Sequence, residues 1–112
     1  MEDVLLIEES GGIARVTLNR PQRLNAMDRA LVAALGGYVR GLARRHDIRV
    51  VILQGAGANF CAGLDVKDQQ RQPSGAEDMM STQHGIRDIM LGLRRCPQPV
   101  IAVVQGAASG GG

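Results

Sequence analysis

The chain has 112 residues and a formal net charge of +2, and 45% of its residues are hydrophobic. It contains one Tyr, one Phe and no Trp, so a small domain with an aliphatic core is possible. The charge is almost balanced, aromatic side chains that could stack on bases are scarce, and no helix-turn-helix or zinc-finger spacing occurs. We therefore expect no nucleic acid as a partner.

Cysteine content and apolar run length bear on the compartment. Cys61 and Cys96 are too few for a disulfide framework, and the start of the chain lacks the basic and then apolar pattern of a secretory leader. Every apolar stretch is far shorter than the about twenty residues that a membrane-spanning helix needs. These features predict a cytoplasmic chain with reduced thiols and no membrane partner.

Two β-rich runs begin the chain. Residues 4–7 and 13–18 flank Ser10-Gly11-Gly12, a pattern typical of a β-hairpin. Residues 19–25 then predict a polar loop, because Pro21 fixes its own φ and disfavours helix at the preceding residue.

A helix and a strand follow this loop. Asp28 is a suitable helix cap, and the helix is expected to end near residues 44–45, where cations suit the negative end of the dipole. Its apolar face is predicted to consist of Leu31, Leu35, Tyr38 and Leu42. Residues 49–53, closed by Gly55, form a continuous aliphatic run, which predicts a strand of a sheet covered on both faces.

The second half repeats this alternation. Residues 69–78 lack periodicity and predict a surface loop. A second helix is predicted with an apolar stripe of Ile86, Ile89, Met90 and Leu93. Residues 96–99 contain two prolines that end it, and residues 100–104 predict another buried strand. The order of elements indicates an α/β fold without a domain linker.

Two loops rich in small residues carry the clearest functional signal. Residues 55–65 and 106–112 each follow a predicted buried strand, and in a parallel sheet both would leave the carboxyl edge, where such folds bind ligands. Glycine-rich backbone can bring bare N–H groups to an oxyanion, and a helix starting after Gly63 would present the amide of Leu64. The turn at 106–112 needs a following helix, so we expect the chain to be the first part of a larger domain.

Other functions have weaker signals. Asp65 is as easily a helix cap as a ligand-binding residue, and the two roles are compatible. Gly55-x-Gly57 follows a strand, but Phe60 stands where a dinucleotide-binding loop has its third glycine. Ser109 lacks nucleophile-elbow spacing, and His46 and His84 have no partners at metal-ligand spacing, so we expect neither a serine hydrolase nor a metal site. No acid and base pair is recognisable among the carboxylates.

Four blocks of sequence, in order and in register, strongly resemble the enoyl-CoA hydratase/isomerase (crotonase) family. The resemblance covers nearly the entire chain but only roughly the first half of the family's domain. The blocks are Thr17-Leu18-Asn19-Arg20-Pro21 with Asn25-Ala26, Phe60-Cys61-Ala62-Gly63-Leu64-Asp65, Cys96-Pro97-Gln98-Pro99-Val100-Ile101-Ala102, and Gly106-Ala107-Ala108-Ser109-Gly110-Gly111-Gly112.

This resemblance implies a spiral of ββα repeats, incomplete over residues 1–112, which form the N-terminal part of a single acyl-CoA-binding domain. It implies an acyl-CoA thioester as substrate, with coenzyme A as part of that substrate and no prosthetic group, and a homotrimer that often pairs into a hexamer. The backbone amides of Leu64 and Gly111 would be the oxyanion-hole donors that stabilise a thioester enolate. The residues implied to contact CoA or the substrate are Arg23, Leu24, Ala26, Ala62, Gly63, Leu64, Asp65 and Gly110.

The reaction itself stays open at this stage. Hydratases of this family have one glutamate two positions past the last glycine of the triplet and a second farther on, and both places fall beyond Gly112. The first hypothesis is therefore an acyl-CoA hydratase or double-bond isomerase. The alternative is a non-catalytic acyl-CoA-binding or assembly module, or an inactive fragment.

Overall fold

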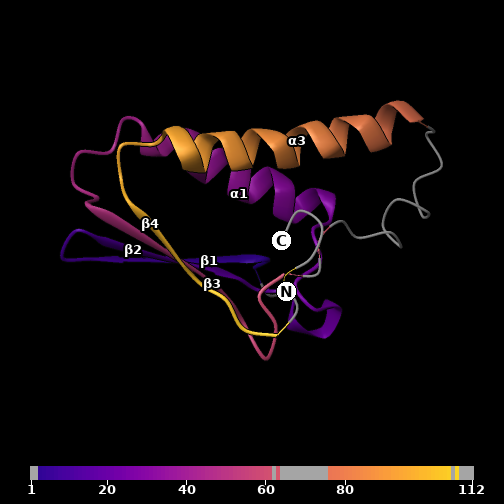
Figure 1. The fold of residues 1–112 in the computed structure, drawn as a ribbon, viewed down its shortest axis with the longest axis horizontal. Helices are drawn as coiled ribbons and strands as arrows, with labels where there is room; N and C mark the ends of the chain where they lie inside the picture. The colour runs from indigo at the N-terminus through magenta and orange to yellow at the C-terminus, as the bar shows by residue number, and fades with distance from the viewer. Residues whose placement is uncertain (1–2, 62, 64–75, 107, 109–112) are drawn as a thin grey trace.

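A four-stranded sheet forms the base of the molecule, and the computed structural model describes residues 3–61, 63, 76–106 and 108 (Figure 1). The strands lie in the order β1-β2-β3-β4 and comprise β1 (Leu5–Ser10), β2 (Ile13–Leu18), β3 (Val50–Gly55) and β4 (Val100–Val103). β1 pairs antiparallel with β2, whereas β2, β3 and β4 run parallel to one another. The predicted α/β class is confirmed.

The hairpin between β1 and β2 turns on two residues. Gly11 and Gly12 both have positive φ, +59° and +83°, which is the backbone geometry that tight two-residue hairpin turns require. Ser10, which the sequence placed in the turn, pairs with Ile13 and is the last residue of β1. The turn is therefore one residue shorter than predicted, because two left-handed glycines suffice to reverse the chain.

Helix α1 (Arg29–Leu42) begins as predicted, since Asp28 Oδ1 accepts a hydrogen bond from the Leu31 amide at 2.8 Å. Its buried residues are Leu31, Leu35, Gly36, Val39 and Leu42. Tyr38, also predicted on this apolar face, is partly buried and packs against the core, so that prediction is confirmed. Its hydroxyl donates to Glu9 Oε2 at 2.6 Å, and the neighbouring Val39, which was not predicted on this face, is buried as well.

Helix α3 (Ala76–Arg95) begins earlier than the sequence predicted. Residues 76–78, assigned to the end of a surface loop, lie in its first turn. His84 lies within this helix and is exposed. Ile86 and Ile89 are buried as predicted, but Met90 is 51% exposed, so its place on the apolar stripe was wrong. Residues 69–75 lie outside the described part of the chain.

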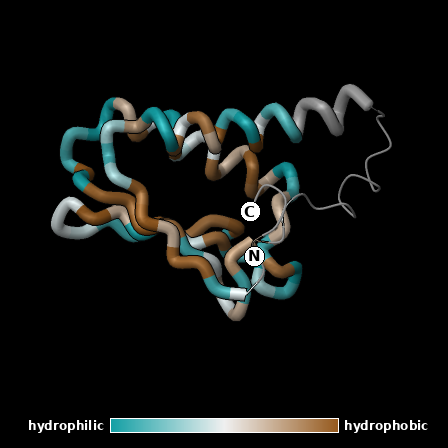
Figure 2. Tube along the Cα trace, viewed as in Figure 1, coloured by the Kyte–Doolittle hydropathy of each residue, from teal (hydrophilic) through white to brown (hydrophobic). Residues whose placement is uncertain are grey.

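Both helices lie on the same side of the sheet, with α1 between α3 and the strands (Figure 1). α1 and α3 approach closely at glycines: a Cβ at Gly92 would collide with Val39 Cγ1, and one at Gly85 would lie 2.6 Å from Val32 Cγ1. Hydrophobic residues run along the strands, whereas α3 alternates between hydrophilic and hydrophobic turns (Figure 2). The core thus lies between one sheet face and two helices. Among the described residues, no helix has the length and apolar character needed to cross a membrane.

The opposite face of the sheet is open in this structure, which corrects the expectation of a sheet covered on both faces. Its exposed apolar residues are Leu6, Ile13, Ile101 and Val103. β4, predicted as a buried strand, is half-buried at Val100 and exposed at its other three residues. A hydrophobic run predicts that a strand prefers burial but does not identify what covers it.

Candidate functional site

The carboxyl ends of three parallel strands meet at one edge of the sheet. β2 ends at Leu18, β3 at Gly55 and β4 at Val103, and three connecting segments, 19–27, 56–63 and 104–108, leave from these ends. Figure 1 shows the 3-10 helix η1 (Pro21–Arg23) close to the loops that follow β3 and β4. In open α/β sheets this edge is where ligands bind.

The loops after β3 and β4 are hydrogen-bonded to each other. The Phe60 amide donates to the Gln105 carbonyl at 2.8 Å, and Gln105 Nε2 donates back to the Gly57 carbonyl at 2.8 Å. Beyond them, Cys61 and Ala108 form an isolated parallel bridge. The prediction that the two small-residue loops emerge on one edge is confirmed for the described residues.

Backbone geometry accounts for two glycines in these loops. Gly106 has φ +62°, and a Cβ there would collide with the Ala58 carbonyl oxygen and lie 2.5 Å from Asn59 Oδ1. Gly63 has φ +93°, a conformation that residues with a Cβ rarely adopt. Both positions therefore favour glycine, for lack of space at Gly106 and for backbone conformation at both.

Asn25 lies at the centre of the three segments, and the sequence assigned it no role. Its side chain is completely buried, and Nδ2 donates to the carbonyls of Ala56, at 2.9 Å, and Asn59, at 2.8 Å. Its Oδ1 accepts from the Arg20 amide at 2.8 Å. Position 25 also has φ +55°, which asparagine tolerates better than most residues. A polar residue in a turn with left-handed backbone is the signal that was available, but its partners are not visible in the sequence.

The candidate CoA-contacting residues of the first segment lie beside the second loop. Arg23 is partly exposed in η1, while Leu24 is 50% exposed and has φ +55°. The Ala26 amide donates to the Arg23 carbonyl at 3.0 Å, and the next amide, of Met27, donates to the Gly63 carbonyl at 2.6 Å. The structure thus brings Arg23, Leu24, Ala26 and Gly63 to one edge.

The other predicted site residues lie outside the described residues. They are Ala62, Leu64, Asp65, Gly110 and Gly111. Leu64 directly follows Gly63, and Gly111 stands three positions after Ala108. The described residues nearest in sequence before the two predicted oxyanion-hole donors are therefore Gly63 and Ala108.

The charged groups and the thiol described at this edge have structural partners. Arg20 donates to the Ala26 carbonyl and lies 3.5 Å from Asp28 Oδ2, so the carboxylate of this segment is engaged by the arginine as well as by the start of α1. Burial raises the pKa of the Cys61 thiol, although its Sγ accepts a hydrogen bond from the Gly63 amide at 3.4 Å. Cys61 is thus a neutral packing residue and hydrogen-bond acceptor at neutral pH.

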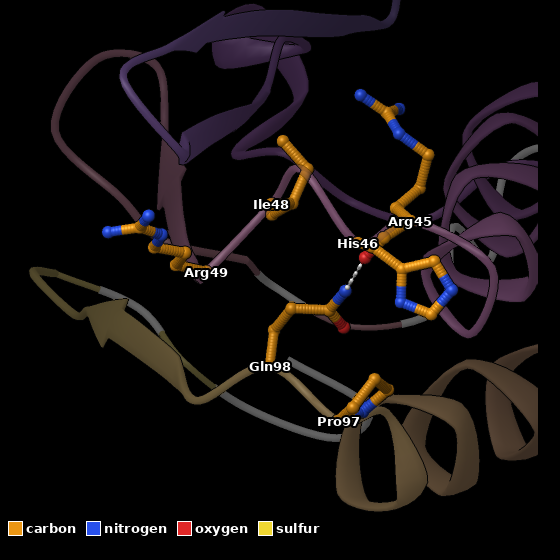
Figure 3. Close-up of a pocket in the computed structure, with 6 residues that line it drawn as sticks. All are labelled: Arg45, His46, Ile48, Arg49, Pro97 and Gln98. Atoms are coloured by element: carbon orange, nitrogen blue, oxygen red, sulfur yellow. Dashed lines mark hydrogen bonds between the residues drawn. The ribbon is translucent and has the colours of Figure 1, made fainter.

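A separate hollow of about 320 Å³ lies at the amino edge of the sheet, away from the three loops (Figure 3). Gln98 is 5% exposed there, and its Nε2 donates to the carbonyls of Leu42, at 2.8 Å, and Arg45, at 2.9 Å. His46 lies at the rim and is exposed. Over the described parts of the chain, no three His, Cys, Asp or Glu side chains are grouped to hold a metal ion.

Comparison with known proteins identifies sequence relatives. A family model described as enoyl-CoA hydratase/isomerase matches residues 8–112. The 1,2-epoxyphenylacetyl-CoA isomerase of Escherichia coli K12 is 37% identical over 114 residues, covering 100% of this chain and 44% of the relative. A probable enoyl-CoA hydratase, echA12 of Mycobacterium leprae, is 39% identical over 106 residues, covering 89% of this chain and 36% of the relative. The chain thus spans less than half the length of these relatives.

Solved structures agree with the sequence relatives. An enoyl-CoA hydratase from Bacillus anthracis has a TM-score of 0.88 and 33% identity, over 97% of this chain and 42% of its own. An enoyl-CoA hydratase from Mycobacterium smegmatis has a TM-score of 0.85 and 40% identity, over 92% of this chain and 40% of its own. The resemblance noted in the sequence is therefore confirmed, and the chain belongs to the enoyl-CoA hydratase/isomerase family.

Proposed function

We propose that this chain forms the N-terminal part of an acyl-CoA-processing domain whose protein is an enoyl-CoA hydratase or double-bond isomerase. Family membership supports an acyl-CoA substrate, and the sequence relatives named above are a 1,2-epoxyphenylacetyl-CoA isomerase and a probable enoyl-CoA hydratase. The observation that carries the proposal is the Cys61–Ala108 bridge, which joins the two small-residue loops at the ligand-binding edge.

In the proposed mechanism, the backbone amides of Leu64 and Gly111 donate to the thioester oxygen. In hydration, water adds across C2 and C3, and in double-bond migration a proton leaves C2 and another is added at C4. Both routes place negative charge on the thioester oxygen as an enolate forms. Amides fixed in advance stabilise that charge more in the transition state than in the ground state, which lowers the barrier.

Substrate contacts are proposed along the same edge. The segment of Arg23, Leu24 and Ala26 would border the CoA nucleotide, and residues 62–65 would hold the adenine and pantetheine, with Gly110 beside the second donor. The exposed side chain of Leu24 offers apolar contact, and the guanidinium of Arg23 suits a phosphate. Coenzyme A enters as part of the substrate, with no prosthetic group.

Neither proton-moving group is assigned within this chain. Asp28, the carboxylate in the first segment, already accepts from the Leu31 amide and lies beside Arg20. The oxyanion hole proposed here polarises the substrate, and the proton-transfer residues are expected beyond Gly112.

The deciding experiment supplies the native-length protein with a 2-enoyl-CoA and, separately, with a 3-enoyl-CoA. Hydration removes the near-ultraviolet absorbance of the conjugated thioester, whereas isomerisation of the 3-enoyl ester creates it. Conversion of either ester supports the proposal and identifies the reaction. Binding of both esters without conversion would instead favour a non-catalytic acyl-CoA-binding module.

Assembly and location complete the proposal. We propose a homotrimer or hexamer, as the family resemblance implies, and a cytoplasmic location, for which the two isolated cysteines are the support. Light scattering of the native-length protein tests the assembly, and cell fractionation tests the location. A monomer or a membrane-bound fraction would contradict these two statements without affecting the proposed chemistry.

A further inference from the structure

We propose that Asn25 is a positioning residue: its buried amide holds the loop after β3 in the geometry that the Leu64 amide needs to meet the thioester oxygen. This inference rests on the proposed function. Asn25 would act through the loop backbone and would not touch the substrate. The argument starts from its hydrogen bonds.

Both N–H groups of the Asn25 side-chain amide donate hydrogen bonds to main-chain carbonyls of a single loop. Nδ2 donates to Ala56 at 2.9 Å and to Asn59 at 2.8 Å, and Oδ1 accepts from the Arg20 amide at 2.8 Å. With no exposed surface, the side chain cannot exchange these partners for water. Losing its donors would leave two partly buried carbonyls without these bonds, and a carbonyl left unsatisfied away from water costs more than its bond contributes.

The fit around this amide leaves little room for adjustment. A Cβ at Gly55 would lie 2.7 Å from Asn25 Nδ2 and would also collide with the carbonyl oxygens of Asn59 and Phe60. The loop therefore folds back directly over Gly55, with carbonyl groups pointing inward. Asn25 supplies the donors that make this inward geometry stable.

From Asn59 the restraint extends toward the proposed oxyanion-hole donors. The next amide, of Phe60, donates to the Gln105 carbonyl, so the loop after β4 is tied to the same short stretch. Farther along the loop, the Gly63 carbonyl accepts a hydrogen bond at 2.6 Å from the amide of Met27, which lies two residues after Asn25. The segment that carries Asn25 thus holds the loop on both sides of Cys61, immediately before Leu64.

Gln98 provides a matched control for a purely structural role. It is also buried, and its Nε2 also donates to two main-chain carbonyls, of Leu42 and Arg45. It lines the hollow at the amino edge (Figure 3), whereas the proposed site lies at the carboxyl edge of the sheet. Asn25→Asp and Gln98→Glu each replace a doubly donating NH2 by a carboxylate oxygen, so both disturb the fold in the same chemical way.

The test compares the two variants in the native-length protein, at a temperature where circular dichroism shows both to be folded. One readout is kcat and KM for the enoyl-CoA that the wild type converts. The second is the near-ultraviolet absorbance of bound acetoacetyl-CoA, a 3-ketoacyl thioester whose enolate absorbs strongly when an oxyanion hole stabilises it. Asn25→Ser, which is neutral and smaller, replaces Asn25→Asp if that variant does not fold.

We expect the Asn25 variant to lose about tenfold to a hundredfold in kcat, with KM changed far less, because a small misplacement of the donor weakens transition-state contacts first. The enolate absorbance should fall in parallel. Gln98→Glu should lose stability but keep kcat within about twofold. Equal kcat losses in both variants, or an unchanged Asn25 variant, would overturn the inference alone. A wild type without conversion or enolate absorbance would overturn the proposed function as well.

Discussion

Gly106 lies against Asn59 so closely that a Cβ at position 106 would stand 2.5 Å from the asparagine Oδ1. The two residues belong to different loops, one after β4 and the other after β3, and the backbone at Gly106 has φ +62°. Side-chain size and backbone conformation therefore both require glycine at the place where the loops meet.

Gly106→Ala should consequently destabilise the native-length protein by about 2 kcal/mol or more, since it combines a left-handed backbone with overpacking. Denaturant unfolding measures this loss. Gly41→Ala is the control, because Gly41 lies in α1 with nothing near its absent Cβ, and alanine there should be neutral or stabilising by up to about 1 kcal/mol. Equal stability of the two variants would contradict the close approach at Gly106.

Acid should weaken the link between β1 and the end of α1. Hydrogen bonds from Arg45 and Tyr38 hold the pKa of Glu9 below its ordinary value, and a hydrogen bond from Arg45 lowers the pKa of Asp47 to about 2. A carboxylate with a lowered folded-state pKa contributes stability that is present above its unfolded-state pKa. That contribution is lost as the pH falls through the folded-state value, here between about pH 5 and pH 2.

The stability difference between wild type and Arg45→Met should therefore be largest near pH 7 and should disappear toward pH 2. Denaturant midpoints at several pH values measure it, and added salt should reduce it, because solvent reaches all three side chains. Arg44→Met, an exposed neighbour, should show a pH profile parallel to that of the wild type. A difference that persists unchanged at pH 2 would show that Arg45 acts through packing.

Cys61 should react with iodoacetamide more slowly than Cys96 in the native protein, by about tenfold or more. Cys61 is buried and its thiol pKa is raised, whereas Cys96 is only partly buried. Peptide mapping of timed alkylation reactions measures both sites separately. In denaturant the two rates should converge, and fast native labelling of Cys61 would contradict its position between the loops.

Gly111→Pro tests the second proposed donor. Proline has no amide hydrogen, so turnover should fall by about a hundredfold or more. Gly111→Ala retains the N–H group and should lose much less. Steady-state kinetics on the native-length protein measure both, and unchanged turnover in the proline variant would reject Gly111 as a donor.

Local signals predicted most of the fold because they operate over a few residues. The glycines of the hairpin, the Asp28 cap and the aliphatic runs of β2 and β3 act on their own neighbourhoods, and the structure confirms each. The errors arise where burial depends on how a helix packs against its neighbours. Met90 was predicted on the apolar stripe of α3 but is 51% exposed, and Val39 of α1 is buried although it was not predicted to be. The hydrogen bond from the Tyr38 hydroxyl to Glu9 was also not predictable, because it depends on a strand 29 residues earlier.

The location of the candidate site could be predicted from the sequence, but the hydrogen bonds that hold its loops together could not. Two strand ends followed by small residues indicated the ligand-binding edge, because parallel topology alone brings such ends together. Asn25 was missed because its acceptors lie 31 and 34 residues later. A sequence pattern shows that a residue is polar, but its burial and partners arise only when the three segments meet.

The two hydrogen bonds from Asn25 to the loop after β3 affect how the sequence of this loop can change. The Asn25 amide donates only to the main-chain carbonyl oxygens of Ala56 and Asn59 in this loop, and every amino acid has such an oxygen. Side chains on the outer surface of this loop can therefore be exchanged without altering the restraint on its backbone. A loop held in this way can acquire new surface chemistry, and with it new ligand preferences, while the geometry of its main chain is inherited unchanged.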